Sequence, residues 1–161
     1  MPKTCEAPPA PAYHRGVRLR GKKGREFQIH PERALWTDPT DRVVGVHRHV
    51  RVTVVGREVG AYNGFTEQVT AGQLLRVADW LEAAATGATS TVEIGTADEG
   101  VRLEHRGEGS LMAELRGELR PWYLAEPAEV VQFKLQVEPQ ELRRGARELR
   151  AELEAWQAVL D

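Results

Sequence analysis

The stretch TAGQLLRVADWLEAAATG, from Thr70 to Gly87, has the apolar periodicity of one amphipathic helix between strand-like segments. Thr70 is suited to the N-cap, Gln73 stands where the return partner of a capping box would stand, and Gly87 suits the residue after the last turn. Leu75 and Trp80 would widen the apolar face. We therefore expect a helix over residues 70–86 that covers a sheet and performs no chemistry. The residues that we expect it to bury are Leu74, Val77, Trp80 and Leu81.

Alternating apolar and polar residues predict strands on both sides of this helix. The clearest run before it is VVGVHRHVRVTVVG, Val43 to Gly56, in which the valines share one parity. A strand between Glu26 and Trp36 would precede this run, and Arg57 to Glu67 could pair back on it as a hairpin. Four more runs follow the helix: Ser90 to Ala97, Val101 to Glu108, Leu111 to Arg120 and Val130 to Glu138. They are typical of an antiparallel sheet with one wet face.

A second helix is predicted to start near Pro139, a residue suited to the first helical position. Arg144–Glu148 and Arg150–Glu154 would pair on its wet face. Its apolar stripe consists of Leu142, Ala146, Leu149, Leu153, Trp156 and Leu160. The expected fold class is α+β: an antiparallel sheet of about six to eight strands, curved or folded into a sandwich, with an inserted helix over 70–86 and a C-terminal helix over 139–160.

Length and composition predict a soluble bacterial protein of one domain. The 161 residues are 41% hydrophobic and 29% charged, which is ordinary for a globular chain. We expect a disordered tail rich in proline and alanine over residues 1–16 and one α+β domain over 17–161. Cys5 is the only cysteine, so no internal disulfide can form. Without an apolar leader or a membrane-length apolar run, we expect a cytoplasmic protein that binds no membrane.

Charge is unevenly distributed along the chain, although the formal net charge is only −2. Residues 1–58 carry twelve Lys or Arg against six acids, whereas residues 93–129 carry nine acids against four Arg. The basic cluster from Arg15 to Glu26 is either a solvated arm leading into the first strand or an anchor for phosphate or an acidic partner. Only Tyr13 and Phe27 lie near it, and this scarcity of stacking residues disfavours nucleic-acid binding.

Catalytic and metal-binding motifs are absent from the sequence. His47 and His49 would point to the same side of a strand, but a metal site would need His105 or His30 to arrive through the fold. There is no phosphate loop, dinucleotide fingerprint or GxSxG elbow. We therefore expect no catalytic residue, no metal and no cofactor. The alternative is a ligand-binding domain or small enzyme whose site is assembled only in the fold.

Three fragments carry a resemblance to a known family: ADWLEAAATG (Ala78 to Gly87), ELRPWY (Glu118 to Tyr123) and VEPQELRRGARELRAELEAW (Val137 to Trp156). Their order and spacing resemble the WapI-type immunity proteins, which inhibit wall-associated polymorphic toxins of bacteria, and their uncharacterised relatives. The resemblance covers about residues 43–156. The segment GTADEGVRLEH departs from the family pattern by lacking its proline, asparagine and aromatic residue.

The resemblance implies a non-enzymatic protein that neutralises a cognate toxin by masking it. Together with the charge distribution, it predicts an acidic surface that meets a basic toxin, with aromatic residues as anchors. The expected partner-binding residues are Glu93, Asp98, Glu99, Glu104, Glu114, Glu118, Trp122 and Tyr123. A nucleic-acid-associated protein that uses the basic segment 15–25 is the remaining alternative.

Overall fold

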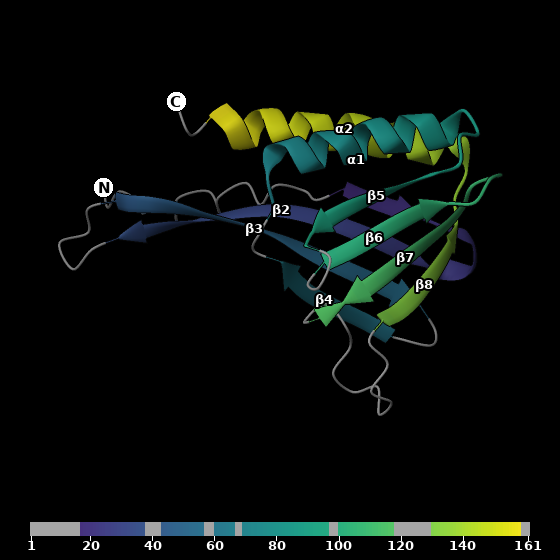
Figure 1. The fold of residues 1–161 in the computed structure, drawn as a ribbon, viewed down its shortest axis with the longest axis horizontal. Coiled ribbons are helices and arrows are strands. Elements are labelled where there is room, and N and C mark those ends of the chain that lie inside the picture. The colour runs from purple at the N-terminus through teal and green to yellow at the C-terminus, as the bar shows by residue number, and fades with distance from the viewer. Residues whose placement is uncertain are drawn as a thin grey trace, which may run out of the picture.

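Two antiparallel four-stranded sheets and two α-helices make up the described part of the chain (Figure 1). The computed structural model describes residues 17–37, 43–56, 60–66, 69–96, 100–117 and 130–158. Each sheet is a simple meander, because its strands neighbour one another in sequence order. This architecture confirms the expected α+β class, with an inserted helix and a C-terminal helix.

The first sheet contains β1 (Val17–Arg20), β2 (Glu26–Thr37), β3 (Val43–Gly56) and β4 (Gly60–Thr66). The predicted hairpin of the last two strands is confirmed. Strand β1 was not predicted, and the expectation of an arm leading into the first strand is wrong for these residues. Val17 and Leu19 are buried opposite Ile29 and Phe27, but a strand of four residues is too short for its alternation to be distinctive.

The second sheet contains β5 (Ser90–Gly95), β6 (Gly100–His105), β7 (Ser110–Arg116) and β8 (Val130–Gln136). All four runs predicted after the helix are therefore strands. Leu111, Ala113 and Leu115 face the core as their parity predicts. Met112, on the opposite parity, is only 3% exposed, and the Arg106 guanidinium lies 3.3 Å from its sulfur. Its burial is an exception to the expected wet face.

Helix α1 (Ala71–Ala85) is bounded by the two residues that the sequence singled out. The Thr70 hydroxyl accepts a hydrogen bond from the Gln73 amide at 3.1 Å. Gly87 has a φ of 96°, and the next amide, that of Ala88, donates to Ala83 O at 3.0 Å, which completes a Schellman motif. The Gln73 side chain does not close a capping box; it exchanges two hydrogen bonds with the Gly95 backbone and so fixes α1 to β5.

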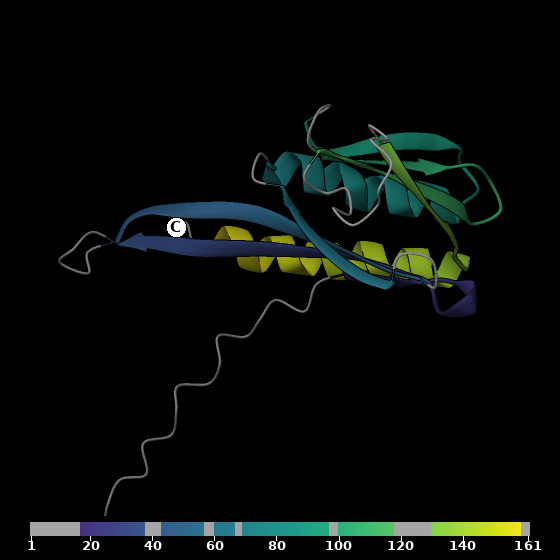
Figure 2. The same ribbon diagram turned by 90° about the horizontal axis from the view of Figure 1, so that it is seen from below.

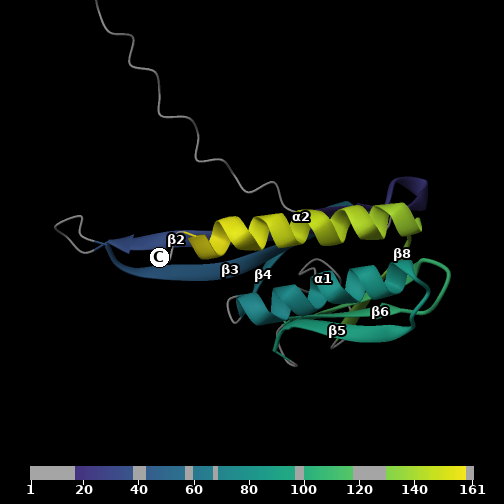
Figure 3. The same ribbon diagram turned by 90° about the horizontal axis from the view of Figure 1, so that it is seen from above.

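The two helices lie side by side, with α2 (Pro139–Ala158) along β1 and β2 and α1 along β5 (Figures 2 and 3). One contiguous apolar cluster contains residues of both sheets and both helices. The four residues expected to be buried on α1 are buried: Leu74, Val77, Trp80 and Leu81. Leu75 is 42% exposed, so it does not widen the apolar face as expected. Burial of each large side chain contributes about 1.5–3 kcal/mol to folding.

Helix α2 covers the free edge of the first sheet at β1. Glu141 accepts a hydrogen bond from the Arg20 amide at 3.1 Å, and the Arg144 guanidinium donates to Arg18 O. Arg144 also binds Glu141 and Glu148, which confirms one expected pair. These bonds satisfy edge groups that would otherwise be open to another strand.

The second pair expected on α2 is wrong. Arg150 pairs with Asp79 and Glu82 of α1 rather than with Glu154 of its own helix. The arginine therefore joins the two helices, and a contact between helices is not visible in the spacing along one of them. In the described residues no helix has the length and apolarity that crossing a membrane requires.

The first sheet comes close to the second at Gly21, which follows β1. A Cβ atom on Gly21 would lie 2.8 Å from Leu135 Cγ and 3.0 Å from Gln136 O of β8. Gly56, at the end of β3, makes a similar approach, because its Cβ would lie 3.1 Å from the Phe133 ring. The absence of a side chain at Gly21 thus lets the first hairpin rest on the second sheet.

We predict that Gly21→Ala lowers the free energy of unfolding by about 1–3 kcal/mol, because the added methyl overpacks this junction. The matched control is Gly72→Ala on α1, where the added Cβ would meet only Thr70 Oγ1, at 3.8 Å. That substitution should raise the free energy of unfolding by about 0.5–1 kcal/mol. Urea unfolding measures the free energy of unfolding of both variants. Equal changes in the two variants would contradict the close approach at Gly21.

A second prediction concerns acid stability. The hydrogen bond from Arg144 lowers the pKa of Glu141 below its ordinary value of 4.5. The stabilisation is therefore fully present above pH 4.5 and is lost as the pH falls through the lower pKa of the folded protein. We expect Glu141→Gln to lower the free energy of unfolding at pH 7 by about 1 kcal/mol and to remove this part of the acid dependence. The free energy of unfolding of the native protein and of Glu141→Gln is measured between pH 7 and pH 3. The same pH dependence in both proteins would contradict the prediction.

Candidate partner-binding site

The outer face of the second sheet carries three of the acids expected to bind a partner. Strand register places Glu93 opposite Arg102, and Arg102 opposite Glu114. In the next row, Glu104 lies opposite Met112. The expected acids on β5, β6 and β7 are thus brought together on one face, because the three strands are consecutive neighbours in the sheet.

Arginines separate these acids. Arg116 lies 3.0 Å from Glu114 and 3.7 Å from Glu93, and Arg106 lies 3.5 Å from Glu104. The described part of this face therefore carries both signs of charge. The ion pairs restrict the carboxylate side chains to defined positions. A partner that binds them therefore causes a smaller loss of side-chain conformational entropy. The other expected members of the site lie outside the described residues: Asp98, Glu99, Glu118, Trp122 and Tyr123.

Two of the four histidines considered for a metal site, His30 and His105, have described side chains. His47 and His49 lie on β3 in a stretch paired with β2, and their side chains are outside the description. His30 bonds Gln28 Oε1 through Nε2 at 2.9 Å. Within the ranges that the structure covers, no group of three or more His, Cys, Asp or Glu residues could hold a metal ion.

His105 has a structural environment that the sequence did not reveal. It is 1% exposed, and its Nδ1 lies 2.5 Å from Ala88 O while its Nε2 accepts a hydrogen bond from the Gly109 amide at 3.1 Å. Both ring nitrogens are therefore used, in the tautomer with the proton on Nδ1. The ring ties the end of β6 to the segment between α1 and β5 and to the β6–β7 turn. The sequence does contain one sign of this burial. His105 has the same parity along β6 as the core residues Val101 and Leu103, so its side chain points to the same face of the strand.

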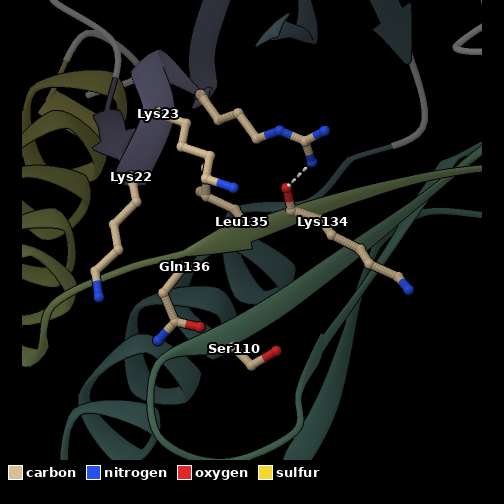
Figure 4. A pocket seen from close by; sticks show the side chains of 7 residues that line it. Lys22, Lys23, Ser110, Lys134, Leu135 and Gln136 are labelled. Carbon is tan, nitrogen blue, oxygen red and sulfur yellow. Dashed lines mark hydrogen bonds between the residues drawn. The ribbon is translucent and has the colours of Figure 1, made fainter. Parts of the chain in front are cut away.

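An open basic pocket lies where the turn after β1 meets the second sheet (Figure 4). Its volume is about 780 Å³. The described residues that line it are Lys22, Lys23, Arg25, Ser110, Lys134, Leu135 and Gln136. They include four cations and no acid, so the basic pocket should attract anionic groups.

The turn that bears three of these cations has a defined conformation. Lys23 and Gly24 have φ values of 61° and 72°, and the Arg25 amide donates to Lys22 O at 3.4 Å. Two successive positive φ values are typical of the type I′ turn, which matches the twist of antiparallel strands. The Arg25 guanidinium donates to Lys134 O at 2.6 Å and lies 5.4 Å from the centre of the Phe133 ring. Arg25 thus holds the turn against β8.

The basic segment identified in the sequence is divided by the fold. Arg18 and Arg20 lie 3.5 Å and 4.0 Å from Glu26, so part of the segment is compensated within the hairpin. Lys22, Lys23 and Arg25 instead line the basic pocket together with Lys134 of β8. Lys134 could not have been assigned to this cluster from sequence, because it lies 109 residues from Arg25.

A model described as the immunity protein WapI-like family matches residues 18–157. Comparison with curated proteins and with solved structures gives no significant match. The family match begins in β1 and ends in α2, so it includes nearly all of both sheets and both helices.

For the buried histidine, we predict that His105→Leu lowers the free energy of unfolding by about 2–4 kcal/mol, because it leaves Ala88 O and the Gly109 amide unpaired. His30→Leu serves as the control at a partly buried site and should cost less. Chemical denaturation of both variants provides the measurement. If His105→Leu were as stable as the native protein, the two ring hydrogen bonds would not matter to the fold.

Proposed function

Because this chain belongs to the WapI-like immunity protein family, we propose that it binds and masks a cognate bacterial toxin without catalysing a reaction. The observation that carries the proposal is the family match over residues 18–157. We place this action in the cytoplasm, where an immunity protein would protect the cell that makes the toxin. Masking requires only a complementary surface, which agrees with the sequence's lack of a catalytic motif.

The proposed contact surface is the outer face of the second sheet. Glu93, Glu104 and Glu114 lie on it beside arginines, so a complementary toxin surface would present cations opposite the acids and acids opposite the arginines. Such complementarity speeds encounter and suppresses wrong partners. The remaining residues of the proposed surface are Asp98, Glu99, Glu118, Trp122 and Tyr123.

The described interior supports a binding protein over an enzyme. The cavity between the sheets, bordered by Leu19, Trp80 and Phe133, has a volume of about 10 Å³, which is too small for a substrate. Of the residues that the enzyme alternative invoked, Glu114 is not among the described residues that line the basic pocket, and the side chains of His47 and His49 lie outside the description. Neither feature favours a small-molecule reaction.

The nucleic-acid alternative receives less support than toxin binding. Two arginines of the basic segment 15–25 are paired with Glu26, and the aromatic ring beside the basic pocket, Phe133, is buried under Arg25. A binding site for single-stranded nucleic acid needs exposed rings on which bases can stack.

The function is tested by searching the genes beside this one for a secreted toxin and expressing that toxin in bacteria with and without the protein. We expect the toxin alone to arrest growth and the protein to restore it through a stable complex. No restoration, or no complex by size-exclusion chromatography, would reject toxin masking.

The contact surface is tested separately by charge reversal. We expect the double variant Glu93→Lys and Glu104→Lys to weaken toxin binding about tenfold or more, because both charges become repulsive. The control reverses Glu138 and Glu154, two exposed acids at β8–α2 and on α2, and should leave the affinity within about twofold. Surface plasmon resonance measures both affinities. If the Glu93→Lys and Glu104→Lys variant bound the toxin as tightly as the native protein, the sheet face would not be part of the interface, and the proposal of toxin masking would stand.

A further inference from the structure

The lysines of this chain are concentrated at one place. Only four of the 22 basic residues are lysines, and three of the four, Lys22, Lys23 and Lys134, line the basic pocket. Arginine's planar group favours fixed ion pairs, whereas lysine presents a flexible point charge. The fold therefore gathers its adaptable cations where the first hairpin meets the second sheet.

These lysine charges are left available to a partner. In the described ranges, none of the three ammonium groups forms an ion pair with a carboxylate, and no acid lines the basic pocket. The arginines of the neighbouring sheet face differ, because Arg106 and Arg116 are paired with acids of the same face. The charges of these three lysines are therefore not neutralised by the described part of the chain.

The donors are arranged for several spaced carboxylates rather than for one phosphate group. Specific phosphate sites converge fixed donors, such as helix N-termini, backbone nests or arginine forks, on one anion. Here the Arg25 guanidinium already donates to Lys134 O, and three of the four cations are ends of long flexible side chains. Nucleic acid fits less well, because the Phe133 ring is covered by Arg25.

We propose that the basic pocket receives an acidic segment of the protein partner, which inserts Asp or Glu side chains between the turn after β1 and β8. The proposal rests on the toxin-binding function and specifies the chemistry of the partner. The basic pocket adjoins the proposed contact surface, because Lys134 lies opposite Met112 on β7, which lies opposite Glu104 on β6. One partner can therefore contact both the sheet face and the basic pocket.

The turn offers a variant that removes charge without harming the fold. Lys23 has a φ of 61°, a left-handed conformation that asparagine adopts more readily than lysine. Lys23→Asn should therefore keep or improve stability, and Lys22→Gln keeps a polar side chain at the neighbouring position. The matched control is the double variant Arg76→Gln and Arg147→Gln, which removes two exposed cations from α1 and α2.

The test uses an octaglutamate peptide as the probe, at about 0.15 M salt so that weak long-range attraction is screened. Acetylation of lysines is followed by mass spectrometry with and without the peptide. Lys3 is the internal reference, because it is the one lysine of the chain that is not named in the proposal. Inorganic phosphate and a twenty-nucleotide oligothymidylate serve as competing probes in separate samples.

We expect octaglutamate to slow acetylation of Lys22, Lys23 and Lys134 about threefold or more and to leave Lys3 unchanged. The double variant Lys22→Gln and Lys23→Asn should bind the peptide about fivefold more weakly, whereas the arginine control should change its affinity less than about twofold. Absence of protection by octaglutamate, or equal weakening by the arginine control, would overturn the proposal.

The competing probes distinguish other occupants. Protection by phosphate alone at lower concentration than octaglutamate would identify a small-anion site, and stronger protection by the oligonucleotide would identify a nucleic-acid site; either overturns the proposal. Failure of toxin masking has a different signature. In that case growth would not be restored, although octaglutamate would still protect the three lysines. If the lysine double variant bound the toxin with the affinity of the native protein, the proposal for the basic pocket would be overturned and toxin masking would stand.

Discussion

The contact of Gly21 with Leu135 determines how the two sheets meet. A side chain at Gly21 would collide with Leu135 and with the backbone of Gln136, so the turn after β1 can rest on β8 only because glycine is there. Arg25 strengthens the contact through its bond to Lys134 O and its position over Phe133. This approach places the lysines of the turn and Lys134 around the same pocket.

The C-terminal helix solves a second problem, the open edge at β1. Glu141 and Arg144 bond the backbone of Arg20 and Arg18 while they pair with each other, so a charged pair takes the place of a neighbouring strand. Near them, Gly145 brings α2 close to Val17 and Leu81, which joins β1, α1 and α2 in one packed contact. The helix thus protects the edge from other chains and closes the core.

Two kinds of charged surface adjoin each other in this protein. On the second sheet, Arg116 holds Glu93 and Glu114 in an ordered network, which suits a specific complementary face. At the basic pocket, lysines remain unpaired among the described residues and can adjust to a partner. An immunity protein must bind one toxin tightly, and an ordered face beside an adaptable one would give both selectivity and capture. The acidic surface expected from sequence is therefore one part of a mixed surface.

The sequence by itself determined both helices, seven of the eight described strands, and the burial of Leu74 and Trp80, because side-chain periodicity and helix caps act over a few residues. It also predicted the acids of the candidate site, which stay a prediction, but gave no sign of their arginine partners. Tertiary structure decided the burial of Met112, the bond of Arg150 to α1 and the placement of lysines from two distant segments around the basic pocket. Those features depend on contacts between distant segments, whose geometry leaves no periodic trace in either segment.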